Sequence, residues 1–407
     1  MKVSATRVVV LAASLSLGLG LAACSSSSSA GSSGSSTTSS SSGTPYQIGA
    51  TEDLSGGLAA FGKWFQQTWQ AEFDSVNQAG GINGHQVKLT ILDDQSNVPS
   101  AIANVKQLLS QGNILVTGSV LSDICAGVTP LATAAKVPLD CYATTKASLD
   151  PVQEFVFGSS PPELVDAPVA MQWVQTVTKA SKPRVAVLNA NSAGSQQFAS
   201  TIISDLQAKG WPLASHQVSV ATDANASPGQ MAQLAASHPD AIIAEEVGAY
   251  TQTAIKALRA DGYQGPILNQ SADSTGLQAL ADPNYYAMQT NLLITPTSSG
   301  SAAKQYVTLM KAKGITGTAN LNSGQIVLEY MRAALLTAAL KNCSGTCTGQ
   351  SLATALANTT ISMPGITSEF GYSPTDHDPV SSVYIYGYDA STKSVVLKSG
   401  PDAVSGP

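Results

Sequence analysis

From Tyr46 onward, short apolar strands alternate with amphipathic helices, and this alternation restricts the chain to a small set of folds. Segment 87–91 alternates apolar and polar residues, as a half-buried strand does. Phe65, Trp69 and Phe73 recur at helical spacing. Strands that alternate with helices indicate parallel sheets covered on both faces. We therefore predict an α/β fold.

The alternation runs through the chain twice. The expected strands lie at 47–51, 87–91, 114–117 and 139–142, and then at 184–189, 216–220, 241–244 and 266–269. The expected helices lie at 65–76, 102–109 and 129–135, and then at 164–177, 198–206, 230–236 and 253–260. Two long helices at 302–313 and 324–341 and a hairpin of 383–388 with 395–398 follow. This pattern predicts two doubly wound parallel-sheet lobes, with a ligand cleft between the carboxyl ends of their strands.

Charge argues against a nucleic-acid partner. The formal net charge is −6, only 11% of the residues are charged, and no basic stripe occurs. No segment after the N-terminus is apolar for long enough to cross a membrane.

The N-terminus resembles a bacterial lipoprotein signal. Lys2 and Arg7 flank an apolar run at 8–21, which small residues and then Cys24 follow. The run is shorter than the ~20 residues that a membrane-spanning helix needs. The resemblance implies that residues 1–23 are removed and that Cys24 carries the lipid. The Ser-rich range 24–45 then forms a flexible tether, so we expect an extracytoplasmic protein anchored to the cell membrane by lipid.

Four cysteines remain, which is an even number in an oxidising compartment. We pair Cys343 with Cys347 in a tight loop, and Cys125 with Cys141 across one strand-helix-strand turn. The alternative is a metal site built on Cys343 and Cys347, but neither a histidine nor a second close pair completes it.

A glycine turn precedes the first helix. The run from Gly57 to Gly62 and Lys63 matches a phosphate-binding loop, except that Trp64 replaces the Ser or Thr that would hold magnesium. We interpret it as a turn whose backbone N–H groups face the cleft and are available to a ligand. The chain carries neither a G-x-S-x-G nor an H-E-x-x-H motif. We therefore expect no enzymatic activity, no cofactor and no metal.

Two acidic segments are interpreted as turns. Asp93 and Asp94 end a strand, and we interpret them as a hydrogen-bonded turn at the cleft edge rather than an acid/base pair. Segment 376–378, Asp-His-Asp between two prolines, predicts a solvated turn rather than a metal cluster.

Three segments resemble the type I periplasmic binding proteins, and more narrowly the branched-chain amino-acid receptor group of ABC importers. They are Ile48-Gly-Ala-Thr-Glu-Asp-Leu-Ser55-Gly, Gly80-Gly-Ile-Asn-Gly84 before a strand, and Asp93-Asp94 at the end of that strand. The resemblance extends from about Tyr46 to the C-terminus. It implies two lobes joined by a three-strand hinge that closes on a small solute. We assign 46–162 and 292–366 to the first lobe, and 163–291 and 367–407 to the second.

The resemblance also implies ligand-binding residues in the first lobe. Ser122 matches the serine that binds the ligand's carboxylate, and Ala143 and Thr145 match the next strand-end turn. Ser55, in the first loop, is a further candidate ligand-binding residue. Phe61 and Trp64 follow that loop and can cover an apolar part of the ligand, although Trp64 fits equally well between helices.

The second lobe departs from the family pattern. The aromatic residue that caps the ligand is replaced near Ser192, and Ser271 stands where an acidic residue would bind an amino group, so we take Ser192 and Ser271 as the candidate ligand-binding residues at these two positions. Glu246 or Asp273 can supply that charge from a shifted position. Otherwise the solute carries no ammonium, because a buried ammonium without a paired acid is costly.

The resemblance implies a monomeric receptor that delivers a small polar solute, such as an amino acid, an amide or a carboxylate, to an ABC permease. The alternatives are a ligand-sensing lipoprotein of the same fold with a signalling partner, and an extracytoplasmic hydrolase.

Overall fold

The computed structural model describes residues 43–118, 120–142, 145–159, 167–219, 228–245, 249–270, 274–317, 321–343, 345–380 and 382–403. The predicted signal peptide and Cys24 lie outside these residues. Within the described part, none of the helices combines the length and apolar character needed to cross a membrane.

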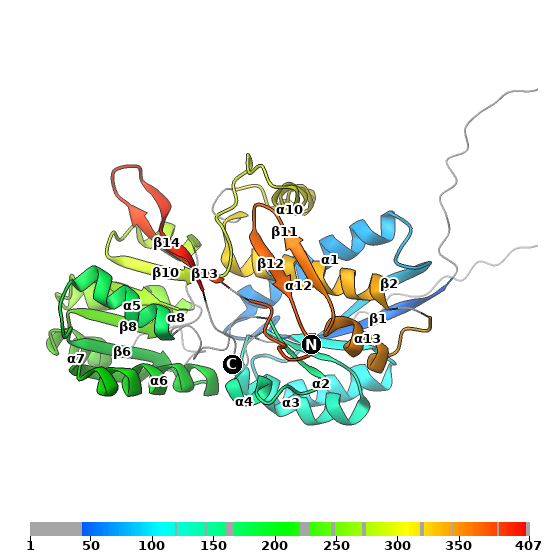
Figure 1. Cartoon of the computed structure of the whole chain (residues 1–407), viewed down its shortest axis with the longest axis horizontal. Coiled ribbons are helices and arrows are strands. Elements are labelled where there is room, and N and C mark those ends of the chain that lie inside the picture. Colours follow the sequence, from blue (N-terminus) through cyan, green and yellow to red (C-terminus); the bar gives the residue numbers. More distant parts are fainter. Residues whose placement is uncertain are drawn as a thin grey trace, which may run out of the picture. The chain divides into compact units, whose positions relative to one another are not determined.

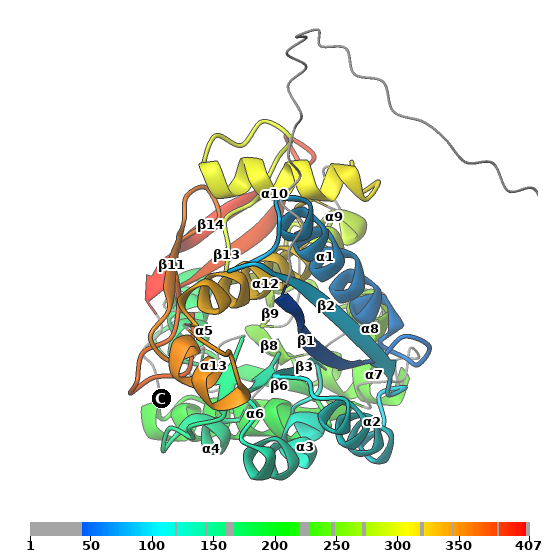
Figure 2. The same ribbon diagram turned by 90° about the vertical axis from the view of Figure 1, so that its right-hand side faces the viewer.

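The first sheet has five strands in the order β2-β1-β3-β4-β5, and its ladders are all parallel. Its strands are β1 (Gly43–Glu52), β2 (His85–Asp93), β3 (Leu115–Gly118), β4 (Leu139–Cys141) and β5 (Val156–Gly158). Its helices are α1 (Ala59–Gln78), α2 (Val98–Ser110), α3 (Ser122–Ala135), α4 (Lys146–Leu149), α10 (Ser301–Ala312), α12 (Gly324–Asn342) and α13 (Gly349–Leu356). Helices α1 and α12 cover one face, and α2 and α3 cover the other (Figures 1 and 2).

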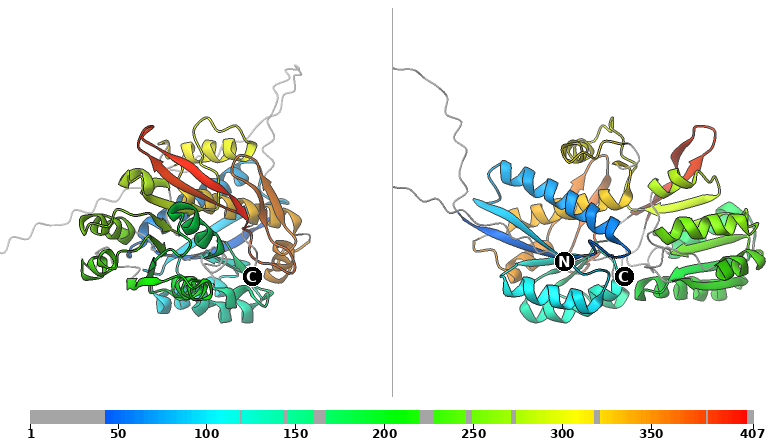
Figure 3. Two further views of the ribbon diagram at one scale, coloured as in Figure 1. Left: turned by 60° about the vertical axis from the view of Figure 1, so that its left-hand side comes forward. Right: turned by 180° about the vertical axis from the view of Figure 1, so that it is seen from behind.

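The second sheet has seven strands in the order β14-β13-β10-β9-β8-β6-β7. Its strands are β6 (Val185–Ala190), β7 (Leu213–Ser219), β8 (Ala241–Glu245), β9 (Ile267–Asn269), β10 (Tyr285–Gln289), β13 (Ser382–Asp389) and β14 (Ser394–Ala403). Its helices are α5 (Ala167–Thr178), α6 (Ala193–Lys209), α7 (Pro228–Ala236), α8 (Ala249–Ala260) and α9 (Ser274–Leu280). The β13–β14 hairpin, red in Figure 3, forms one antiparallel edge.

Residues along β6 alternate between two hydrophobic clusters. Val185 and Val187 belong to the cluster that contains α5 and α6, whereas Ala186 and Leu188 belong to the cluster that contains α7 and α8. Successive strand side chains point to opposite faces, so both faces of the sheet are buried. This confirms the predicted two-lobed α/β class.

The chain passes between the two sheets three times, after β5, after β10 and after the hairpin of β11 (Thr360–Met363) and β12 (Thr367–Gly371). The sheets refine the predicted lobe boundaries. Because β11 pairs with β12, the boundary placed after residue 366 falls inside one hairpin. Strand β1 begins at Gly43, inside the range predicted for the tether.

Candidate functional site

The turn after β1 is organised by Asp53. The carboxylate of Asp53, which is only 5% exposed, accepts hydrogen bonds from the backbone N–H groups of Ser55 at 3.1 Å, Gly56, and Leu58 at 2.7 Å. The hydroxyl of Ser96 also donates to it. These N–H groups are therefore bonded inside the protein, which corrects the expectation that the turn offers them to a ligand. An Asp two residues before a Ser-Gly-Gly turn is the sequence signal that could have identified this acceptor.

The Asp93-Asp94 segment is a hydrogen-bonded turn, as predicted. Asp93 accepts from the N–H of Leu54 at 2.9 Å and from the hydroxyl of Ser55, which is exposed. Asp94 is fully buried and accepts from the hydroxyl of Thr51 at 3.0 Å and from the N–H of Ser96 at 2.9 Å. Burial is the main cause that raises the pKa of Asp94 to about 6: the hydrogen bonds from Ser96 and Thr51 lower the pKa, and the charges of Asp53 and Asp93 make smaller contributions that raise it.

Replacing Asp94 by asparagine should stabilise the protein at neutral pH. The pKa of Asp94 is raised from 3.8 to about 6 in the folded state, so its favourable contribution is complete below pH 3.8 and is lost as the pH rises through 6. Asp94→Asn removes that loss. The free energy of unfolding measured in urea should therefore increase by about 1–3 kcal/mol at pH 7 and change little at pH 4. Asp93→Asn should show the opposite sign, because hydrogen bonds outweigh burial and lower the pKa of Asp93. A gain from Asp94→Asn that does not depend on pH would contradict this assignment.

Ser122 lies where helices from the two lobes meet. It is the first residue of α3, and it is 3% exposed. Its Oγ accepts a hydrogen bond of 2.9 Å from the N–H of Gly194, in the first turn of α6. A hydroxyl that accepts one bond still has its own hydrogen to donate. Two helix N-termini and one O–H group therefore converge, which is a favourable environment for a carboxylate or a carbonyl oxygen.

The other predicted polar residues form local contacts. Ser192 caps α6, where its Oγ accepts from the N–H of Ser195 at 3.3 Å and lies 2.6 Å from the Oγ of Ser195. The Oγ1 of Thr145 lies 3.1 Å from the Oγ of Ser148, just before α4. Ser192 and Gly194 therefore both belong to the N-terminus of α6. Thr145 lies after β4, the strand next to β3.

Phe61 and Trp64 form an aromatic pair at the start of α1. Their rings meet edge to face at 5.2 Å between centroids, and both side chains are half-buried. Trp64 also packs against the first lobe's hydrophobic core. Both interpretations offered for Trp64, a helix contact and a partly accessible cover, are compatible with this position.

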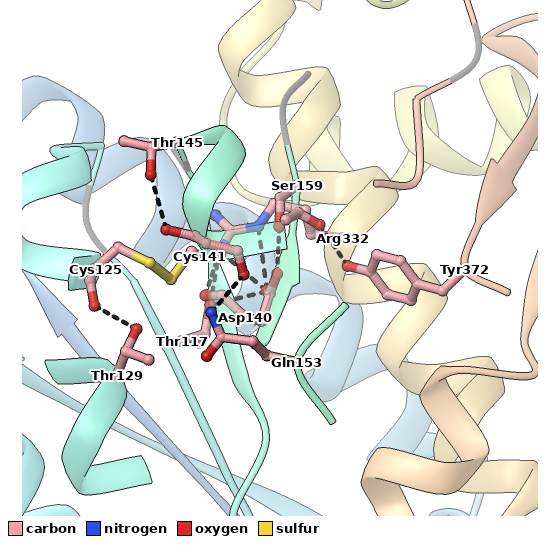
Figure 4. Close-up of a disulfide and its surroundings, with 12 residues drawn as sticks. Thr117, Cys125, Thr129, Asp140, Cys141, Thr145, Gln153, Ser159, Arg332 and Tyr372 are labelled. Carbon is pink, nitrogen blue, oxygen red and sulfur yellow. Dashed lines mark hydrogen bonds and ion pairs between the residues drawn. A yellow bond between two sulfur atoms is a disulfide. The ribbon is translucent and has the colours of Figure 1, made fainter. Parts of the chain in front are cut away.

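Both cysteine pairs are bonded as predicted, Cys125 to Cys141 and Cys343 to Cys347. Cys125 lies three residues after Ser122 on α3, and Cys141 is the last residue of β4. The first disulfide therefore ties the helix that carries Ser122 to the strand that leads toward Thr145 (Figure 4). Among the described residues, no group of His, Cys, Asp and Glu side chains is arranged to hold a metal ion.

A buried ion cluster supports the same strand ends (Figure 4). Arg332 of α12 is 3% exposed and donates to both carboxylate oxygens of Glu329 at 2.8 and 2.9 Å. It also donates to Asp140 on β4 at 3.0 Å and to the hydroxyl of Thr117 on β3 at 2.7 Å. Burial opposes the charge of Arg332, but Asp140 and Glu329 raise its pKa above the usual value. Sequence reasoning missed this cluster, although a Glu and an Arg three residues apart in an apolar helix were a usable signal.

Four predicted binding residues, Ala143, Glu246, Ser271 and Asp273, lie outside the described residues. The segment at 376–378 requires a correction. His377 is not solvated: it is 2% exposed, stacks on Phe157 with 4.1 Å between ring centroids, and its Nδ1 lies 2.8 Å from the carbonyl oxygen of Val156. The apolar strand β5 buries the imidazole, and the local proline pattern did not reveal this.

Comparison with known proteins agrees with this architecture. The sequence model of the periplasmic binding protein family matches residues 45–393. The chain is 30% identical over 81 residues to Leu/Ile/Val-binding protein homolog 3 of Brucella melitensis, a match that spans 20% of this chain and 22% of that relative.

Solved structures share the fold. The branched-chain amino acid transporter substrate-binding protein of Streptococcus pneumoniae, in complex with isoleucine, is 22% identical, with 89% of this chain and 100% of that chain covered and a TM-score of 0.72. A fatty acid ABC transporter substrate-binding protein of Thermomonospora curvata is 19% identical, with 87% and 91% covered and a TM-score of 0.73. The chain therefore belongs to the periplasmic binding protein family, with the two-lobed type I fold that the sequence predicted.

Proposed function

We propose that the protein is the lipid-anchored, extracytoplasmic substrate-binding component of an ABC importer. It binds a small polar solute in the cleft between the lobes and closes on it by hinge motion. The observation that carries this proposal is the hydrogen bond between Ser122 on α3 and Gly194 on α6, which brings helix N-termini from both lobes to one point. A solute with a carboxylate or carbonyl group at this point would bind both lobes at once.

The proposed tether fits this arrangement. The chain enters the first sheet at Gly43, whose partner in β2 is His85, and the ring of Tyr46 stacks on His85 at 4.7 Å. This is the amino end of the parallel strands, opposite the carboxyl ends where ligands bind in open α/β sheets. The lipid-anchored tether would therefore join the first lobe at the end opposite the proposed cleft. The Ser-rich tether would also keep the protein close to its permease. The monomeric state and the permease partner are parts of this proposal.

Titration calorimetry tests the proposal. The mature chain should bind at least one solute from a panel of amino acids, amides and carboxylic acids. Ser122→Ala should weaken that binding by more than tenfold, since a hydrogen bond to a charged group contributes ~1.5–3 kcal/mol. Ser200→Ala, an exposed serine on α6 whose hydroxyl donates only to the carbonyl of Gln196, is the matched control and should bind as the wild type does. An unchanged affinity of Ser122→Ala would remove Ser122 from the site.

A further inference from the structure

The last residue of β10, Gln289, has a buried amide that makes no hydrogen bond. Gln289 is 5% exposed, and neither its Oε1 nor its Nε2 has a partner. Buried amide groups are normally hydrogen-bonded, because an unpaired one loses its water without compensation. Gln289 also lies at the carboxyl end of a strand that runs parallel to β9, and ligands bind at such ends. A buried, unpaired amide at this edge points to a ligand.

The amide of Gln289 lies against the N-terminus of α12. A Cβ atom placed on Gly324, the first residue of α12, would lie 3.1 Å from Cδ and 3.4 Å from Nε2 of Gln289. No side-chain hydrogen bond caps this helix. The first N–H groups of a helix have no acceptor within the helix, so they add donors beside Gln289.

Two further amides with unpaired oxygens flank Gly324. These atoms are Oδ1 of Asn322 and Oε1 of Gln325, and both are buried although each residue is partly exposed. The hydroxyl of Ser274, at the start of α9, donates to the backbone carbonyl of Asn322. This bond places the start of α12 beside the segment that follows β9. Two uncharged amides with unpaired oxygens thus lie next in sequence to Ser323 and Gly324, the start of the helix that contacts the amide of Gln289.

We infer that Gln289, Asn322, Gln325 and the N-terminus of α12 form a subsite for a primary carboxamide of the solute. Three carbonyl oxygens are unpaired, and the two N–H groups of a carboxamide can donate to two of them. Its own carbonyl oxygen can accept from Nε2 of Gln289 or from the helix N–H groups. A carboxylate has no hydrogen to donate to these oxygens, and none of the described residues that form this subsite carries the negative charge that a buried ammonium needs. This inference rests on the function proposed above and narrows its solute class.

Matched solutes test the subsite. Calorimetry would compare three triplets with wild-type protein: glutamine, glutamate and methionine; asparagine, aspartate and leucine; benzamide, benzoate and toluene. In at least one triplet the carboxamide should bind at least tenfold more tightly than both partners. Gln289→Met, which keeps the volume and removes the hydrogen-bonding atoms, should reduce that preference at least tenfold. Gln107→Met, an exposed glutamine on α2, is the control and should keep the preference.

The ligand-free proteins give a second readout. Because the amide of Gln289 has no partner, Gln289→Met should unfold at the same or a higher Tm than the wild type. A lower Tm would assign Gln289 a structural role and overturn the subsite. Two results would overturn the subsite and leave the receptor function intact. In the first, the wild type binds the acid or alkyl solutes of the triplets as tightly as the carboxamides. In the second, Gln289→Met keeps the wild-type preference for the carboxamide. If wild-type protein binds no member of any triplet, both the subsite and the proposed receptor function for such solutes are wrong.

Discussion

Replacing Arg332 by methionine should lower the free energy of unfolding at pH 7 by about 3–5 kcal/mol, because it leaves buried carboxylates without their cation. Arg332 is the basic partner of Asp140, which is 7% exposed, and of Glu329, which is 4% exposed. The rings of Trp69 and Tyr142 lie 5.5 Å from the guanidinium carbon, and the ring of Phe65 lies 5.8 Å from it. Methionine fills much of the arginine volume, so the loss reports the charge rather than a cavity.

The pH dependence of the stability of Arg332→Met distinguishes the loss of charge from the loss of packing. Burial already raises the pKa of Glu329, and Arg332 is the main group that opposes this rise. Without Arg332 the pKa should rise further, and a raised folded-state pKa means that stability is lost as the pH increases. Chemical denaturation should therefore show a smaller defect of Arg332→Met at pH 5 than at pH 8.

Two controls define the Arg332 experiment. Lys313→Met removes an ion pair with Asp74 whose side chains are 29% and 39% exposed, and it should cost less than about 1 kcal/mol. Adding Glu329→Gln and Asp140→Asn to Arg332→Met should recover part of the lost stability, since no unpaired carboxylate then remains in the cluster. If the free energy of unfolding of Arg332→Met alone lies within 1 kcal/mol of the wild-type value, water or rearrangement compensates the two carboxylates for the lost cation.

The two lobes could be predicted because their strands and helices carry strong local periodicity. Residues that alternate along a strand of the second sheet, such as Val187 and Leu188, belong to clusters on opposite faces and form a continuous apolar run. Strands β5 and β10 have three and five residues and were not predicted; segments this short carry little periodicity, although β4 and β9, with three residues each, were predicted. Short strands acquire their identity from their neighbours in the sheet.

The site was less predictable because its hydrogen bonds join distant parts of the chain. The sequence indicated a turn rich in N–H groups, but not that Asp53 already accepts them. The pairing of Arg332 with Asp140 spans 192 residues, and the contact of Ser122 with Gly194 spans 72. The unpaired state of Gln289 likewise depends on the position of α12. Local patterns supply the chemical groups, whereas tertiary packing decides which of them remain available.

Replacing Asp53 by alanine should cost about 2–4 kcal/mol, since it removes one carboxylate that accepts four hydrogen bonds. The N–H groups of Ser55, Gly56 and Leu58 would lose their common acceptor, and Leu58 is buried where water cannot easily replace it. Differential scanning calorimetry should show the loss. Hydrogen exchange should become faster in residues 54–58 than in the wild type, with a smaller change in α1.

Asp53→Asn is the conservative variant for this turn. The carbonyl oxygen of the asparagine side chain can accept some of the four hydrogen bonds. The stability of Asp53→Asn should therefore lie between those of Asp53→Ala and the wild type. Asp261→Ala, an exposed aspartate after α8, should change the stability by less than about 0.5 kcal/mol. The turn also carries Ser55 and precedes the Phe61–Trp64 pair, so Asp53→Ala should weaken solute binding by loosening that wall of the proposed cleft. If Asp53→Ala and Asp261→Ala prove equally stable, the N–H groups of the turn do not depend on the carboxylate, and they would again be available to a ligand.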